Sequence, residues 1–306
     1  MKYRFNFYHE KDFEEIEEMV FAAYEWEYPI WGLSRHEFSR GLHPAFTGIP
    51  SAWERTVGVW RMDGKIAACA INEGNDEGDI FFLFDGKERA QEEALLEEML
   101  YFAKTTMSSV RDDRITSYVN LRIPEWNETL QAVAEKAGFH KTDWKERINI
   151  LPFQDKKFEV RLPEGYSFAD GETTPDFYLS NVHMAAFRYG ISAVKEGERA
   201  FHDLRQMKHY DPKLDLCILD PAKRPVAMAI IWYDEKMPYC ELEPLGVAWW
   251  ERRKHLATAI LHEASNRVME RYPKCTGMLG GDQPFYEKTG YVTKTEVPVF
   301  AWEEKI

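Results

Sequence analysis

One short segment occurs twice in this chain, and this repetition limits the possible folds more than any other feature. Residues 286–291 read Tyr-Glu-Lys-Thr-Gly-Tyr, and residues 134–139 read Ala-Glu-Lys-Ala-Gly-Phe. We expect each copy to end a short helix, turn at its glycine and enter a strand. The repetition therefore indicates a duplicated fold. Since Ala134 replaces Tyr286 in the first copy, the protonatable group is present once, which favours one working site in the second half.

Other elements recur in the same order. With 306 residues, the chain is long enough for two ordinary domains. Each half has a strand and an acidic, aromatic helix, then two strands around a turn, a third strand, a long helix, a strand, the short helix and a last strand. The expected early elements are 3–7, 12–24, 57–60 and 66–71 in the first half, and 166–168, 176–187, 216–219 and 226–231 in the second. This order predicts an α/β (α+β) fold of two tandem domains, each with a mixed, mostly antiparallel sheet and helices on both faces.

The best domain boundary is the short charged stretch at 151–157. We predict a first domain at 1–152 and a second at 158–306. The hydrophobic content of 44% is enough for two packed cores.

The charge balance argues against two classes of partner. There are 52 acidic and 39 basic residues, giving a formal net charge of -13. An acidic protein repels phosphate backbones and anionic lipids, so we expect neither nucleic acid nor membrane as a partner. No stretch has eighteen consecutive apolar residues, and the N-terminus lacks the apolar core of a signal peptide. We expect a cytoplasmic protein, monomeric or homodimeric.

Cysteines and histidines give no sign of a metal or disulfide framework. Cys69, Cys217, Cys240 and Cys275 are widely spaced, and we expect buried free thiols. The nine histidines have no metal-ligand spacing, so no metal is expected.

Residues 239–248 read as a strand with a disturbance near its end. Alternation places Glu241 and Glu243 on one face. Pro244 and Gly246 fit a strand ladder poorly and indicate a bulge or a splayed strand end.

The next segment predicts an anion site. An apolar stripe begins at Leu256 and indicates a helix that stops before Pro273. Arg252, Arg253, Lys254 and His255 stand immediately before it. Unpaired N–H groups and basic side chains together suit a diphosphate. The alternative is a solvated basic turn.

These motifs resemble those of the GNAT superfamily of acyl-CoA-dependent N-acetyltransferases. The resemblance rests on Glu-Pro-Leu-Gly-Val at 243–247, Arg-Arg-Lys-x-Leu-Ala at 252–257 and Phe-Tyr-Glu-Lys-x-Gly-Tyr at 285–291. It covers the second half well and extends weakly over the first. It implies a splayed sheet whose opening holds acetyl-CoA. Two positions depart from the family pattern: His255 replaces a glycine and Trp249 replaces a proline.

The resemblance also implies roles for individual residues. The pantetheine arm would lie along the strand, the pyrophosphate at the following loop, and Tyr286 would protonate the departing thiolate. The acceptor would lie beside the end of the first long helix of the second half. The implied cofactor residues are Leu245, Gly246, Val247, Ala248, Arg252, Arg253, Lys254, His255, Leu256, Ala257, Thr258 and Phe285, and the implied acceptor residues are Phe187, Arg188 and Tyr189.

Elementary chemistry requires a proton acceptor for the amine and supports the role of Tyr286 as proton donor. A lysine-like amine has a pKa near ~10.4, so its proton must be accepted before it can attack. Glu243, or Glu241 on the same face, is placed to accept it directly or through water; the alternative for a carboxylate here is an edge-strand charge or an orienting group. A phenol with a pKa near ~10 suits Tyr286 as proton donor. The alternative for Tyr286 is a packing role.

The first half lacks these features. Glu88, Glu92 and Glu93 stand where the second half has its basic loop. Carboxylates suit a bare helix N-terminus and repel a diphosphate. Together with Ala134, they predict a degenerate domain that acts as a scaffold or as a wall of the acceptor pocket.

The resulting expectation is an acetyltransferase that moves an acetyl group from acetyl-CoA to a primary amine of a small molecule or peptide. Direct attack in a ternary complex is favoured, because no cysteine is positioned as a nucleophile: Cys240 alternates to the face opposite Glu243. The alternatives are an acyl-CoA-binding sensor or scaffold, and an acyltransferase that uses another acyl-CoA.

Overall fold

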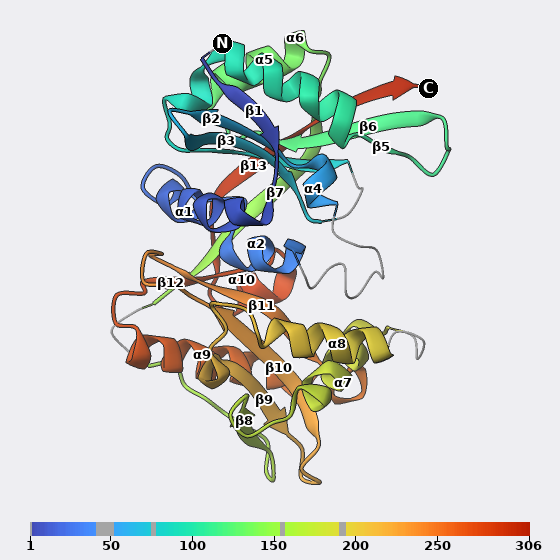
Figure 1. Ribbon diagram of the computed structural model, residues 1–306. Coiled ribbons are helices and arrows are strands. Elements are labelled where there is room, and N and C mark those ends of the chain that lie inside the picture. The colour runs from blue at the N-terminus through green and yellow to red at the C-terminus, as the bar shows by residue number, and fades with distance from the viewer. Residues whose placement is uncertain (1, 41–51, 75–77, 154–156, 190–193) are drawn as a thin grey trace. The chain divides into compact units, whose positions relative to one another are not determined.

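The computed structural model describes residues 2–40, 52–74, 78–153, 157–189 and 194–306. They form two compact units (Figure 1). Unit 1 contains the described residues of 2–40, 52–148 and 293–306, and unit 2 contains those of 149–292. The predicted architecture of two tandem, mixed α/β domains is confirmed.

Unit 1 has a mixed sheet in which strands β4 and β6 diverge. They are parallel neighbours but share only two register pairs, Asp79 with Asn120 and Ile80 with Leu121. The neighbouring strands on the other side of β4 are antiparallel: β1 pairs with β2, β2 with β3, and β3 with β4. The strands are β1 (Arg4–Phe7), β2 (Gly58–Met62), β3 (Lys65–Asn72), β4 (Asp79–Phe84), β5 (Ser109–Val110) and β6 (Thr116–Arg122).

Helices cover both faces of this sheet. Figure 1 shows α5 and α6 together on the face opposite α1. The helices are α1 (Phe13–Ala23), α2 (Leu33–Arg40), α4 (Trp53–Thr56), α5 (Glu93–Phe102) and α6 (Glu128–Lys136), with a π-helical turn at Ala103–Met107. The predicted turn between β2 and β3 is present, with Asp63 at φ 51° and Gly64 at φ 83°. These left-handed values are those that an Asp-Gly hairpin turn requires.

The last strand of the chain completes the sheet of unit 1. Strand β13 (Val292–Lys305) pairs antiparallel with β6, from Val299 opposite Arg122 to Lys305 opposite Thr116. Phe300 and Trp302 lie in the hydrophobic core of unit 1. The chain therefore divides differently from the predicted 1–152 and 158–306, because residues 293–306 belong with the first half.

Unit 2 repeats the same plan. Its sheet runs from the end of β7 (His140–Pro152) through β12, β11, β10 and β9 to β8. Here β11 and β12 are the parallel neighbours, and they share only the pairs Cys240 with Met278 and Glu241 with Leu279. The remaining strands are β8 (Ser167–Asp170), β9 (Asp215–Leu219), β10 (Pro225–Trp232), β11 (Cys240–Val247) and β12 (Gly277–Gly280).

The α-helices described in unit 2 are α7 (Asp176–Phe187), α8 (Val194–Leu204), α9 (Leu256–Arg271) and α10 (Pro284–Lys288). Helix α9 packs on β9, β10 and β11, and α7 packs on β10 and β11. Gly246 of β11 permits this close approach, since a Cβ there would lie 2.8 Å from the Cβ of Ala186. All four cysteines are free and buried, as predicted. Among the described helices, none is long and apolar enough to cross a membrane.

Candidate functional site

A bulge in β11 contains one of the two candidate carboxylates. Ala229 of β10 pairs with Leu245, and Ile231 pairs with Leu242, so Glu243 and Pro244 together oppose a single residue. The bulge predicted from Pro244 is therefore present. The two carboxylates expected on one strand face differ in exposure: Glu241 is buried with 6% exposure, whereas Glu243 is exposed and lines a cavity.

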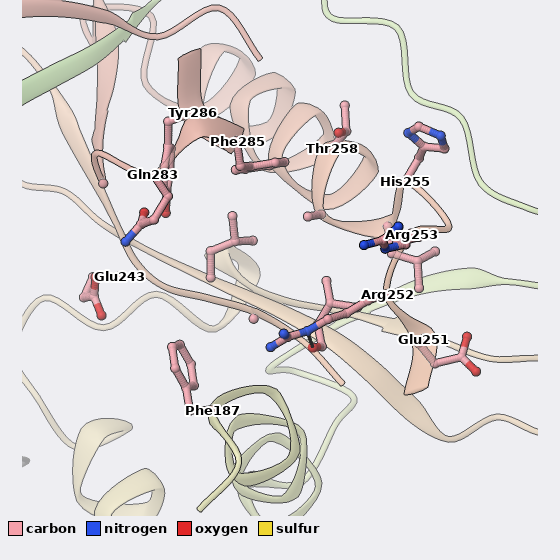
Figure 2. A pocket seen from close by; sticks show the side chains of 16 residues that line it. Phe187, Glu243, Glu251, Arg252, Arg253, His255, Thr258, Gln283, Phe285 and Tyr286 are labelled. Atoms are coloured by element: carbon pink, nitrogen blue, oxygen red, sulfur yellow. Dashed lines mark hydrogen bonds between the residues drawn. The ribbon is translucent and has the colours of Figure 1, made fainter. Parts of the chain in front are cut away.

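The cavity has a volume of about 740 Å³ and lies where β11 has left β12 (Figure 2). Its walls come from four segments of unit 2: the end of β11, the loop before α9 with the first turn of that helix, the turn before α10 with α10 itself, and the end of α7. The lining residues are Phe187, Glu243, Leu245, Gly246, Val247, Glu251, Arg252, Arg253, His255, Leu256, Ala257, Thr258, Gly281, Gln283, Phe285 and Tyr286.

One end of the cavity is basic. Arg252, Arg253 and His255 lie together there, beside the start of α9 (Figure 2). The structure describes every residue in the first turn of α9, and none of them is acidic. Its N–H groups and positive dipole end add to the cationic side chains. This end of the cavity is suited to a polyanion such as a diphosphate.

The loop reaches its conformation without glycine. His255 is the N-cap of α9 and has φ 60° and ψ 18°, the left-handed conformation. Arg253 is also left-handed, with φ 65°. Histidine is one of the non-glycine residues found most often in this region. Thus His255 preserves the backbone conformation that the glycine of the family pattern would adopt easily.

The basic residues differ in their partners. Arg252 lines the cavity while its Nη2 donates to the carbonyl of Ala186 at 2.6 Å. Lys254 is outside the lining set: its Nζ donates to Glu251 at 2.8 Å and to the hydroxyl of Tyr166 at 3.0 Å. The hydrogen bond to Glu251 raises the pKa of Lys254. Lys254 therefore supports the loop through a salt bridge.

The other end of the cavity carries a phenol and a carboxylate. Tyr286 of α10 and Glu243 of β11 lie away from the arginines in Figure 2. Burial, reinforced by the charge of Glu243, raises the pKa of Tyr286 to about 12. The phenol is therefore protonated at neutral pH. Its ring lies directly on the backbone, because a Cβ at Gly280 or Gly281 would approach it to 2.8 or 2.7 Å.

Most of the residues predicted to hold the cofactor line this cavity; the exceptions are Ala248 and Lys254. Ala248 is buried, and its N–H donates to the carbonyl of Val226. Of the predicted acceptor residues, Phe187 lines the cavity, whereas Arg188 and Tyr189 are exposed just beyond α7. Their contact with an acceptor stays a prediction.

Sequence reasoning missed Glu251, Gly281 and Gln283, which also line the cavity. Their positions beside Arg252 and just before Tyr286 were the available signal.

The corresponding region of unit 1 is built differently. Helix α5 begins at Glu93 with Glu92 as its N-cap. Glu92 accepts hydrogen bonds from Lys2 at 2.7 Å and from Tyr3 at 2.6 Å. Ala134, the counterpart of Tyr286, is fully buried in the core of unit 1. The start of α5 is thus acidic, as predicted, and the phenol is replaced by a packing residue.

No protein-family model matches the chain, and no curated protein does. Solved structures do resemble it. A GCN5-related N-acetyltransferase from Sphaerobacter thermophilus aligns with a TM-score of 0.62 at 13% identity, covering 100% of this chain and 96% of that one. A tandem GNAT protein from the clavulanic acid biosynthesis pathway, without AcCoA, aligns with a TM-score of 0.60 at 14% identity, covering 98% of each chain. These likenesses establish that the chain has the GNAT fold in tandem along its whole length.

Proposed function

We propose that unit 2 transfers an acetyl group from acetyl-CoA to a primary amine by direct attack in a ternary complex. The observation that carries this proposal is the polarity of one cavity: arginines and a helix N-terminus at one end, Tyr286 and Glu243 at the other. The basic end is complementary to an anionic cofactor, and the end with the carboxylate is complementary to a cationic amine acceptor.

The strand supports the cofactor assignment. Register pairs between β11 and β12 end at Glu241, so the edge of β11 beyond that point is open to the amide groups of a pantetheine arm. Leu245 and Val247 on this stretch line the cavity, which continues to Arg253 and Thr258. Coenzyme A has the amides of its pantetheine arm followed by a diphosphate, and these groups match the open strand edge and the basic loop in the same order.

The acceptor end supports the chemistry. Glu243 would accept the proton of the attacking amine, directly or through water. The amine nitrogen then forms a bond to the acetyl carbon, and the bond from that carbon to sulfur breaks. Tyr286 donates a hydrogen bond to the departing thiolate, which leaves as the thiol after it takes up the second proton that the nitrogen loses on becoming an amide. Since a thiol has a pKa near ~8.5 and Tyr286 one near 12, stabilising the thiolate is the larger part of this role.

The charge of the acceptor follows from the same end of the cavity. Glu243 lies there, and the charge of Asp282 also acts on Tyr286. Two carboxylates attract a cationic amine before it loses its proton. The acceptor in this proposal is therefore a small-molecule amine or a peptide amine.

The test combines binding with turnover. Thermal unfolding with millimolar coenzyme A and acetyl-CoA is expected to show stabilisation, as ligand linkage requires. Release of free thiol is then measured with a panel of simple amines, amino sugars and peptide amines, and with acetyl-CoA replaced by longer acyl-CoAs. An unchanged melting temperature would remove the cofactor assignment. Stabilisation without thiol release from any pair would instead identify an acyl-CoA-binding sensor.

A further inference from the structure

Two cysteines of unit 2 meet at one carbonyl. Cys240 begins β11, and Cys275 lies between α9 and β12. Both thiols donate to the carbonyl of Gly277, Cys240 at 3.5 Å and Cys275 at 3.3 Å. Both side chains are buried, with 0% and 4% exposure. The shared acceptor holds the two sulfur atoms next to each other.

Two phenols flank this pair. Tyr233 and Tyr291 are buried, with 8% and 4% exposure. Within the part of the chain that the structure describes, neither hydroxyl has a hydrogen-bond partner. Burial raises the pKa of both phenols; the thiols of Cys275 and Cys240 add to this for Tyr233, and Tyr286 followed by Cys240 adds to it for Tyr291. Such orphaned donors are uncommon in protein interiors.

We propose that Cys240 and Cys275 are a redox-active dithiol that peroxide converts reversibly to a disulfide. The Cys275 thiolate attacks one oxygen of hydrogen peroxide, the O–O bond breaks, and Cys275 becomes a sulfenic acid while the other oxygen leaves as water. The sulfur of Cys240 then attacks that of Cys275, an S–S bond forms, and the sulfenic oxygen leaves as a second water with the thiol proton. A dithiol reductant reverses the change.

These reaction steps require two thiols of different pKa, and the two thiols do differ in this way. The hydrogen bond from Cys240 lowers the pKa of Cys275 although burial opposes it. Burial raises the pKa of Cys240. Cys275 is therefore the more acidic thiol, the one that supplies the attacking thiolate, and Cys240 is the resolving thiol. Cys69 and Cys217, by comparison, both have pKa values raised by burial and hold no thiol partner of this kind among the described contacts.

The pair lies close to the cavity described above. Cys240 is three residues before Glu243 on β11, and Tyr291 packs against the ring of Tyr286. A bond between the two sulfurs would tie β11 to the segment that leads into β12. The proposal does not depend on acyl transfer, because its test counts thiols and maps a bond.

The experiment uses the full chain. After brief exposure to graded hydrogen peroxide, free thiols are blocked, and an unreduced digest is examined by mass spectrometry. We expect one cross-link, between the peptides that contain Cys240 and Cys275, and a fall from the four free thiols to two. Dithiothreitol should restore all of them. Four thiols remaining at every peroxide dose would overturn the proposal, as would oxidation of Cys69 and Cys217 at the same rate.

Variants separate the two roles. Cys240→Ser removes the resolving thiol, so Cys275 should accumulate as a sulfenic acid that dimedone labels. Cys275→Ser should leave Cys240 reduced and unlabelled. Equal labelling of the two variants contradicts the assigned roles. Cys69→Ser changes unit 1 only and should retain the cross-link. If a serine variant in unit 2 does not fold, the cross-link test on the unmodified chain and on Cys69→Ser decides the outcome.

Discussion

The ring of Tyr286 packs edge-on against that of Tyr291, with 5.0 Å between ring centroids and 84° between ring planes. The turn that joins them explains this contact: Gly290 has φ 99°, and the N–H of Tyr291 donates to the carbonyl of Tyr286 at 3.1 Å. Unit 1 has the same turn. There Gly138 has φ 92°, and the residue after it donates to the carbonyl of Ala134 at 2.9 Å. The repeated segment is thus a shared backbone turn, and only unit 2 adds the phenol.

Replacing this phenol tests its role. Tyr286→Phe is expected to lower kcat by about 10²–10³-fold, the usual cost of removing one hydrogen-bond donor to a developing anion. The affinity for coenzyme A should change little, because the ring remains. Steady-state kinetics and calorimetry measure the two quantities. Tyr291→Phe is the matched control, since Tyr291 does not line the cavity and should leave kcat nearly unchanged. A Tyr286→Phe enzyme with full kcat would exclude Tyr286 from the mechanism.

The two carboxylates of β11 can be separated by pH. Glu243→Gln should lower kcat/KM for the amine at neutral pH, because no group then accepts its proton. Activity should recover about tenfold per pH unit up to the amine pKa, as the free amine becomes available. Profiles of kcat/KM against pH between about 7 and 10 measure this slope. Glu241→Gln, a change at a buried position outside the cavity lining, should keep the wild-type slope. The opposite pattern would assign the base to Glu241.

The raised pKa of Tyr286 sets the alkaline behaviour of kcat. Because burial and Glu243 raise this pKa to about 12, the protonated phenol is lost only as the pH rises through that value. We therefore expect kcat, measured at saturating amine, to show no decline from this group up to about pH 10, the ordinary pKa of a tyrosine. A decline centred near pH 9 that disappears in Tyr286→Phe would contradict the burial of the donor.

Neighbouring cations in the loop should contribute unequally to cofactor binding. Arg253→Ala removes a charge that lines the cavity and should weaken coenzyme A binding by about tenfold or more, the effect of one charge-assisted contact. Lys254→Ala should have a smaller effect, since Lys254 is held by Glu251. Titration calorimetry at low and moderate salt measures both, and the salt dependence should fall in Arg253→Ala. A larger loss in Lys254→Ala would show that its salt bridge with Glu251 opens when the cofactor binds.

Much of the site could be predicted because its groups are consecutive in sequence. The cations before α9 and the segment around Tyr286 are local patterns, and their chemistry depends on residue type and order. The unequal burial of Glu241 and Glu243 could not be predicted, because Pro244 indicates a bulge but not that Glu243 is part of it. The ion pair of Lys254 with Glu251 depends on left-handed residues in the loop, which no non-glycine sequence pattern specifies.

The partner of the last strand was also beyond sequence reasoning. The alternation of a half-buried strand indicates which face is apolar, but it does not identify the neighbouring strand. In a duplicated fold, two equivalent sheets offer similar edges. Only the three-dimensional structure shows that Val299 to Lys305 pair with β6.

The pairing of β13 with β6 predicts that substitutions in the C-terminal strand destabilise unit 1. Phe300 is fully buried in the core of unit 1, although it follows unit 2 in the chain. Phe300→Ala should lower the unfolding free energy of unit 1 by about 3–5 kcal/mol, the usual cost of such a truncation in a core. Hydrogen exchange should then show faster exchange at the amides of β6 and β4, with β10 unaffected. Glu304→Ala, at an exposed position of the same strand, should leave exchange unchanged. Faster exchange confined to unit 2 would contradict the pairing of β13 with β6 in unit 1.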